Sequence, residues 1–133
     1  MSNKISRNTF TMINPPTIHS YAAVVGKKEG EGPLSSCFDR IEEDSYFGQD
    51  TWEKAESELQ KQTVELALSK VKLIPENVDF MFAGDLLNQC IGSTYALKDL
   101  NIPLLGIYGA CSTMAEGLLL SSIKIGRAHV WTP

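Results

Sequence analysis

The order of apolar segments in the second half of the chain constrains the fold most strongly. Two short apolar runs, Val78–Ala83 and Leu104–Tyr108, have the composition of buried strands. Each run is followed by a turn and then by a helical pattern, over Leu86–Leu100 and Met114–Ile123. Strand, helix, strand and helix joined by short turns predict right-handed parallel crossovers. The chain is therefore expected to be α/β, with a mainly parallel sheet and helices on its faces.

The first half contains one clear helix pattern and one weaker strand pattern. A strand is predicted over Ile18–Val25, and the charged, glycine-rich segment Lys27–Pro33 is predicted to be a connecting loop. Asp50 and Glu53 have the spacing of a capping box, so a long helix is expected from there. Trp52 begins its apolar face, which favours a place in the core over a role as a stacking platform.

Bulk composition favours one globular domain and excludes several functional classes. The 133 residues are 43% hydrophobic and 21% charged, with a net charge of -4. Because no basic stripe is present, nucleic-acid binding is not expected. The sequence shows no secretory signal and no apolar run near the ~20 residues of a membrane span, so a cytoplasmic protein is expected. Three cysteines without metal-ligand spacing predict reduced thiols and no metal site.

Cys111 lies where the second predicted strand turns into the last helix. At the start of a helix, free backbone N–H groups and the helix dipole stabilise a thiolate and can hold an oxyanion. This is the arrangement that an acyl-accepting cysteine needs. The alternative is a small buried side chain that fills a tight turn.

Two turns are expected to meet at one edge of the sheet. Gly84-Asp85 follows the first strand and Gly109–Cys111 follows the second. The carboxyl ends of parallel strands lie at the same edge, where ligands of α/β proteins gather. We therefore predict a binding site there, with Cys90 on the intervening helix as a core residue.

The C-terminal residues 125–133 match the translation of a short-read sequencing adapter. The codons ATC GGA AGA GCA CAC GTC TGA ACT CCA reproduce this segment if TGA is read as tryptophan. We therefore expect this segment not to be native, with Lys124 also in doubt, and the native protein to continue beyond Ile123. His129 and Trp131 are accordingly left out of any site. The remaining chain divides into an N-terminal segment, 1–16, and a partial domain, 17–124.

Several motifs, in order, resemble the stage V sporulation protein AD family. The segment Phe82–Gln89, followed about twenty residues later by Gly109–Thr113, carries most of the resemblance. Gly32–Leu34, Phe38-Asp39 and Trp52–Glu56 are also similar to that family, and the similarity extends from about Thr17 to Ile123. Each motif alone is weak, but the ordered set is specific.

The resemblance implies a thiolase-like fold, of which this chain would be the truncated first half. It implies a sporulation protein that binds dipicolinic acid and aids its uptake into the forespore with a membrane channel complex. Other stage V sporulation channel proteins would be partners, and the full-length protein is expected to be a homodimer. Its expected location is the cytoplasm, peripherally attached to the forespore inner membrane. No cofactor is expected.

Within this resemblance, Cys111 matches the position of the thiolase nucleophile. The histidines that complete a thiolase site come from the second half, so acyl transfer is left open. The expected ligand-binding residues are Asp85, Asn88, Gln89, Cys111, Ser112 and Thr113. Ser112 and Thr113 offer donors to an anion, whereas Asp85 either orients the pocket, with calcium as an accompanying cation, or caps the following helix. Asn88 and Gln89 either bind the carboxylates or contact a partner subunit.

Three functions compete for this site. The first is a dipicolinate-binding accessory protein that uses a retired thiolase pocket. The second is an active acyltransferase that forms a thioester on Cys111. The third is a purely structural partner of the channel with a vestigial pocket.

Overall fold

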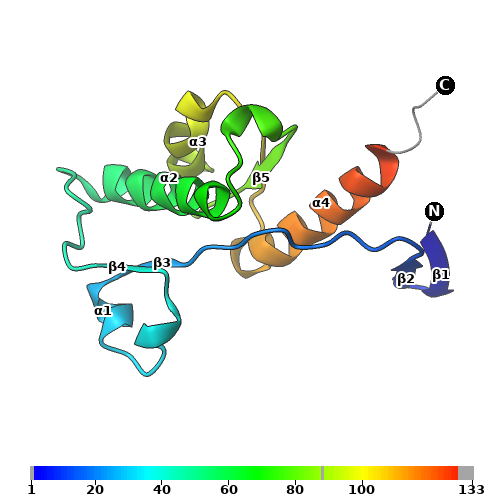
Figure 1. Cartoon of the computed structure of the whole chain (residues 1–133), viewed down its shortest axis with the longest axis horizontal. Helices are drawn as coiled ribbons and strands as arrows, with labels where there is room; N and C mark the ends of the chain where they lie inside the picture. The colour runs from blue at the N-terminus through cyan, green and yellow to red at the C-terminus, as the bar shows by residue number, and fades with distance from the viewer. Residues whose placement is uncertain (1, 88, 129–133) are drawn as a thin grey trace.

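The computed structural model describes residues 2–87 and 89–128 of the chain, with side chains over 5–9, 11–87 and 89–125. These residues form an α/β structure with three separate two-stranded sheets, two of them parallel (Figure 1). The predicted α/β class and parallel pairing are confirmed. The prediction of one larger sheet is wrong for the described residues, since no strand joins one pair to the next.

The strand pair that positions the site is formed by β5 (Met81–Ala83) and β6 (Leu104–Gly106). The two strands are parallel, with Phe82 opposite Leu105, which confirms the predicted parallel pairing. Both strands are shorter than the apolar runs predicted. Leu105 and Tyr108 are exposed, so the expectation of a buried second strand is also wrong.

The connection between these strands holds α3 (Ile91–Leu97) and the 3-10 turn η3 (Lys98–Leu100). The helix was predicted from Leu86, five residues before its observed start. Gln89 and Cys90 have positive φ angles of 59° and 70°, which no helix can accommodate. Leu86 and Leu87 therefore lie in a bend and Gln89 and Cys90 in a turn, so Gln89 is not on a helix.

The long helix predicted from Asp50 onward is confirmed as α2 (Trp52–Lys70), but its N-cap is not the residue predicted. Thr51 is the N-cap, and its Oγ1 accepts a hydrogen bond from the Lys54 amide at 3.3 Å. Asp50 instead forms an ion pair with the Lys54 ammonium. Trp52 is 60% exposed and stacks on Tyr46 at 4.3 Å, so its predicted place in the core is wrong.

The remaining parallel pair is β3 (Val24–Gly26) with β4 (Arg40–Glu42). Between them lie α1 (Lys27–Gly30) and the 3-10 turn η1 (Ser35–Cys37), so the predicted loop begins with a helical turn. Ile18 and Tyr21 are exposed and belong to no strand, which shortens the predicted first strand to its last residues. The Lys70 ammonium contacts the Asp39 carboxylate at 2.8 Å and ties this unit to the end of α2.

An antiparallel hairpin of β1 (Ser2–Ser6) and β2 (Thr9–Met12) precedes these elements. Figure 1 shows it at one end of the molecule, joined to the rest by an extended segment. The chain also contains the 3-10 turn η2 (Pro75–Asn77), and it ends its described part in η4 (Ala110–Ser112) and α4 (Thr113–Ala128). The small core lies chiefly where α2 packs on α3 and where α3 meets β6.

Candidate functional site

The carboxyl ends of β5 and β6 meet as predicted, and Gly84 is the residue that permits it. The Ile107 amide donates a hydrogen bond to the Ala83 carbonyl at 2.9 Å. A Cβ atom on Gly84 would overlap the carbonyl oxygen of Ile107 and would lie 2.9 Å from Cγ2 of Thr113. Only glycine allows the two strand ends and the start of α4 to approach so closely.

A groove of about 660 Å³ opens beside this junction, between α4 and the β5–β6 pair. Cys111 and Thr113 line it, together with side chains from α2, β5 and α4. No lining residue in the described part of the chain carries a charge. The lining residues are Gln60, Phe82, Ala83, Gly84, Ile107, Ala110, Cys111, Thr113, Met114, Gly117, Leu118 and Ser121.

Cys111 lies on η4, the turn that leads into α4, and its side chain is exposed. The alternative of a small buried residue filling the turn is therefore wrong. Ala110 immediately before it has a φ of 50°, in the left-handed region that non-glycine residues seldom adopt. The turn thus presents the thiol at the mouth of the groove.

The side chains of Ser112 and Thr113, which follow Cys111, form hydrogen bonds with the backbone of the turn. Thr113 Oγ1 accepts a hydrogen bond from the Gly109 amide at 3.2 Å. Ser112 Oγ lies 2.6 Å from the Gly109 carbonyl oxygen and 2.9 Å from Oε1 of Glu116. The predicted donors are present at this helix start, and both hydroxyls already have partners within the chain.

Asp85 is buried, with 8% of the residue exposed, and its carboxylate caps α3. Oδ2 accepts hydrogen bonds from the Ser93 amide at 2.7 Å and from the Ser93 hydroxyl at 2.6 Å. Oδ1 accepts one from the Leu87 amide at 2.8 Å. Burial alone would raise the pKa of Asp85, but the bonds from Ser93, Leu87 and the Gly92 amide outweigh it and lower that pKa. Of the two roles left open for Asp85, the structure shows the capping one.

Glu56 of α2 lies near this buried carboxylate. Burial, followed by the negative charge of Asp85, raises the pKa of Glu56, and a hydrogen bond with Gln60 opposes the change. Gln60 also lines the groove, so α2 contributes side chains both to the groove and to the surroundings of Asp85. Within the described residues, no cluster of three or more His, Cys, Asp or Glu side chains could hold a metal ion.

The other predicted site residues lie elsewhere or outside the described part. Gln89 is exposed in the turn before α3 and does not line the groove. Asn88 is outside the described residues. Cys90 is buried as predicted, and its thiol donates a hydrogen bond to the Ile107 carbonyl at 3.1 Å.

One wall of the groove is formed by α4, and none of the residues predicted for the site except Thr113 lies on it. Met114, Gly117, Leu118 and Ser121 line it with the three- and four-residue spacing of one helix face. That periodicity is visible in the sequence and could have identified these residues. Gln60 could not have been found, since only the packing of α2 brings it to the groove.

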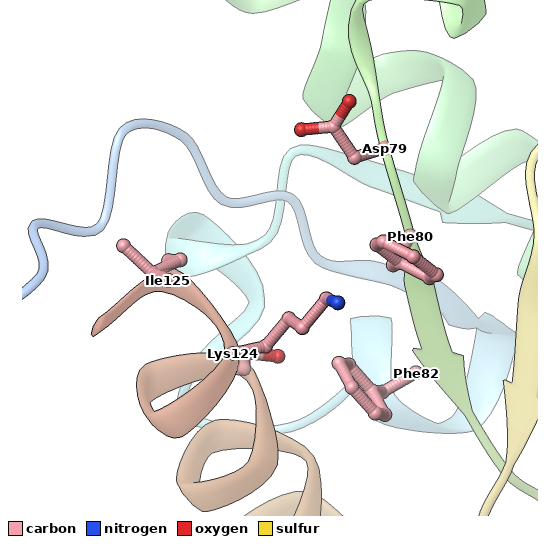
Figure 2. Close-up of a pocket in the computed structure, with 6 residues that line it drawn as sticks. Asp79, Phe80, Phe82, Lys124 and Ile125 are labelled. Carbon is pink, nitrogen blue, oxygen red and sulfur yellow. The ribbon is translucent and has the colours of Figure 1, made fainter. Parts of the chain in front are cut away.

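A second hollow of about 530 Å³ lies between β5 and the last turns of α4 (Figure 2). The Lys124 ammonium lies 4.1 Å from the centre of the Phe80 ring, and Asp79, Phe82 and Ile125 are close by. Because Ile125 falls in the segment 125–133 that is expected to derive from an adapter, and Lys124 is also in doubt, we assign this hollow no function.

Comparison with known proteins identifies relatives of the chain. The family model for Stage V sporulation protein AD (SpoVAD) matches residues 6–130. The chain is 37% identical over 119 residues to the stage V sporulation protein AD of Bacillus subtilis (strain 168). That alignment covers 90% of this chain and 35% of the relative, so the chain spans about a third of the relative's length. Over residues 2–87 and 89–128, none of the helices has both the length and the hydrophobicity that a membrane crossing requires.

Proposed function

Because the chain belongs to the stage V sporulation protein AD family, we propose that it is part of a thiolase-like sporulation protein that binds dipicolinic acid. In this proposal the protein aids uptake of dipicolinate into the forespore, with other stage V sporulation proteins of a membrane channel. It acts as a homodimer attached peripherally to the forespore inner membrane.

The observation that carries the proposal is the groove at the carboxyl ends of β5 and β6. Cys111 and Thr113 line it, as the resemblance to thiolases implies for a ligand pocket. Its apolar walls suit the face of a pyridine ring. The groove supplies no cation within the described residues, so the two carboxylates need compensating charge from calcium or from the rest of the full-length protein. Asn88, Gln89 and Ser112 remain proposed ligand-binding residues of the full-length protein, and Asp85 is proposed to support the site by capping α3.

Calorimetric titration of dipicolinate into a full-length protein carrying this segment tests the proposal. Gly117 lines the groove, and a Cβ there would be at an ordinary 3.6 Å from Ile107 Cδ1. We therefore expect Gly117→Leu to fill the groove and to abolish binding without unfolding the protein. Ala115→Leu adds a similar side chain at an exposed position of α4 outside the groove, and should bind as the wild type does. Absence of binding by the wild type at millimolar ligand would refute the proposal.

The exposed thiol at the mouth of an uncharged groove supports a second candidate, acyl transfer. The Cys111 sulfur would attack the carbonyl of an acyl-CoA, forming a new S–C bond while the bond to the CoA sulfur breaks and that sulfur takes the proton. Incubation with acyl-CoA should then add the acyl mass to the wild type and not to Cys111→Ala. A wild type that never gains this mass would exclude the second candidate.

A further inference from the structure

Two stacked aromatic rings are exposed at the start of α2. The rings of Tyr46 and Trp52 have centres 4.3 Å apart, with an angle of 28° between their planes. Tyr46 is 38% exposed and Trp52 is 60% exposed. We call this pair the aromatic stack. The proposed function assigns it no role.

Hydrogen bonds hold the backbone on both sides of the aromatic stack. Oδ1 of Asp44 accepts a hydrogen bond from the Tyr46 amide at 3.0 Å, and Oδ2 accepts one from the Gly48 amide at 2.8 Å. The Thr51 side chain caps α2 directly before Trp52. Because both residues of the stack are attached to an ordered backbone, a partner that covers them costs this segment little conformational entropy.

The charges next to the two residues of the stack are mainly negative. The amides of Tyr46 and Gly48 lower the pKa of Asp44, so this carboxylate is ionised at neutral pH. Glu53 follows Trp52 and is exposed. Within the described residues, neither Asp44 nor Glu53 forms an ion pair, whereas Lys54 neutralises Asp50 at 2.8 Å. Two carboxylates therefore remain without a counter-ion here.

These charges decide between two kinds of partner, since exposed tryptophan and tyrosine also occur where proteins touch membranes. An anionic lipid surface attracts lysine and arginine and repels carboxylates. A cationic side chain is attracted both to an aromatic face and to a carboxylate. This chain already contains that combination, because the Lys70 ammonium lies 4.6 Å from the centre of the Tyr21 ring and 2.8 Å from the Asp39 carboxylate. The aromatic stack therefore suits a cationic partner.

We propose that the aromatic stack, with Asp44 and Glu53, is a docking surface for an arginine-bearing segment of another protein. One guanidinium lies on the exposed face of Trp52 and binds a carboxylate beside it. Arginine fits better than lysine, because its planar group can stack on the ring and pair with the carboxylate at the same time. Tryptophan and tyrosine are also the residues that most often dominate the binding energy of protein interfaces. The inference does not depend on the groove or on its ligand.

Binding of a short peptide to the full-length protein tests this surface. One immobilised peptide alternates glycine with arginine, and a second replaces each arginine by citrulline, which keeps the shape and removes the charge. By surface plasmon resonance, we expect the wild type to bind the arginine peptide about tenfold more tightly, and less so at high salt. Trp52→Ala should weaken binding of the arginine peptide about threefold to fivefold. Glu53→Gln should weaken it about twofold.

Matched variants control for ring and charge elsewhere. Tyr95→Ala removes an exposed ring of α3 that already has the Lys98 ammonium 5.4 Å from its centre, and Glu65→Gln removes an exposed charge of α2. Both should bind the arginine peptide as the wild type does. Trp52→Phe keeps a ring and should retain part of the affinity. Equal affinity for the two peptides, or equal affinity of the wild type and Trp52→Ala, would overturn the inference.

Sedimentation with vesicles of phosphatidylglycerol and phosphatidylethanolamine tests the membrane alternative. Trp52→Ala should sediment with these vesicles to the same extent as the wild type. If it sediments less while its affinity for the arginine peptide is unchanged, the stack is a membrane anchor and the inference is wrong. Trp52→Ala should also bind dipicolinate as the wild type does, so a failure of the proposed function leaves this inference testable by itself.

Discussion

The buried Asp85 carboxylate stabilises the start of α3 by accepting hydrogen bonds from the Ser93 amide and hydroxyl. The cap forms across eight residues, to Ser93, because the left-handed pair Gln89 and Cys90 delays the helix. Positive φ at two non-glycine residues leaves no sequence signal, so the partner could not be predicted.

This cap should make stability depend on pH. The pKa of Asp85 is lowered in the folded state, so its stabilisation is fully present above the unfolded pKa of about 3.9 and is lost as the pH falls through the folded value. We expect Asp85→Asn to lower the free energy of unfolding by about 2–4 kcal/mol at pH 7, because buried donors lose a charged acceptor. Urea denaturation should show this difference shrinking below about pH 4.

Asp99→Asn changes an exposed carboxylate on η3 and is the matched control, expected to alter stability by less than about 0.5 kcal/mol. Equal losses in the two variants would contradict a capping role for Asp85.

Glu56 should affect stability in the opposite sense. Its pKa is raised in the folded state, so the ionised side chain opposes folding above its unfolded pKa, and this cost disappears as the pH falls. Glu56→Gln is expected to stabilise the protein at pH 7 by roughly 0.5 kcal/mol, after allowance for solvent screening. Glu56→Gln should have no stabilising effect at pH 3. A melting temperature of Glu56→Gln at pH 7 that is lower than that of the wild type would refute this account.

Among the elements, the order and direction of strands were more predictable than their lengths. The alternation of apolar runs correctly gave two parallel strands with a helix between them. Their lengths were overestimated, because a residue joins a strand only where a neighbouring backbone pairs with it. The segment Val78–Phe80 begins and ends with an apolar residue but is not part of β5. The strand begins at Met81, whose amide donates a hydrogen bond to the Pro103 carbonyl.

The junction of β5, β6 and α4 should not tolerate a side chain at Gly84. We expect Gly84→Ala to lower the free energy of unfolding by about 1–3 kcal/mol, since the new methyl group forces the Ile107 carbonyl and α4 apart. The groove should deform with it, so ligand binding should also weaken. Thermal denaturation and calorimetry measure the two effects.

Gly26 is a suitable control, because a Cβ there would meet nothing within 4 Å and its φ of -82° suits alanine. Gly26→Ala should melt within a few degrees of the wild type. If Gly84→Ala is equally harmless, the close approach at the junction has no energetic importance.

At the scale of the whole molecule, much apolar surface of α4 is uncovered. Met114 is 77% exposed, and Leu118, Leu119, Leu120 and Ile123 are exposed along the same helix. Within the described residues, α4 therefore presents a row of apolar side chains to solvent.

This surface predicts the behaviour of the 133 residues in isolation. We expect the isolated chain to self-associate and to bind a hydrophobic dye strongly, because contiguous apolar patches of this kind are rare on monomers. Sedimentation velocity and dye fluorescence would show both effects. A replacement of Leu119 and Leu120 by glutamine should reduce them. A monomer with a sharp cooperative melt would contradict the prediction.

The exposed stack of Tyr46 and Trp52 gives this part of the protein an intrinsic fluorescent reporter. An indole in contact with water emits at long wavelength, and its emission shifts to the blue when a neighbouring surface excludes that water. Trp52 stands at the start of α2, far along the chain from Cys111. Its emission spectrum can therefore reveal when another protein covers this end of the helix, without any label.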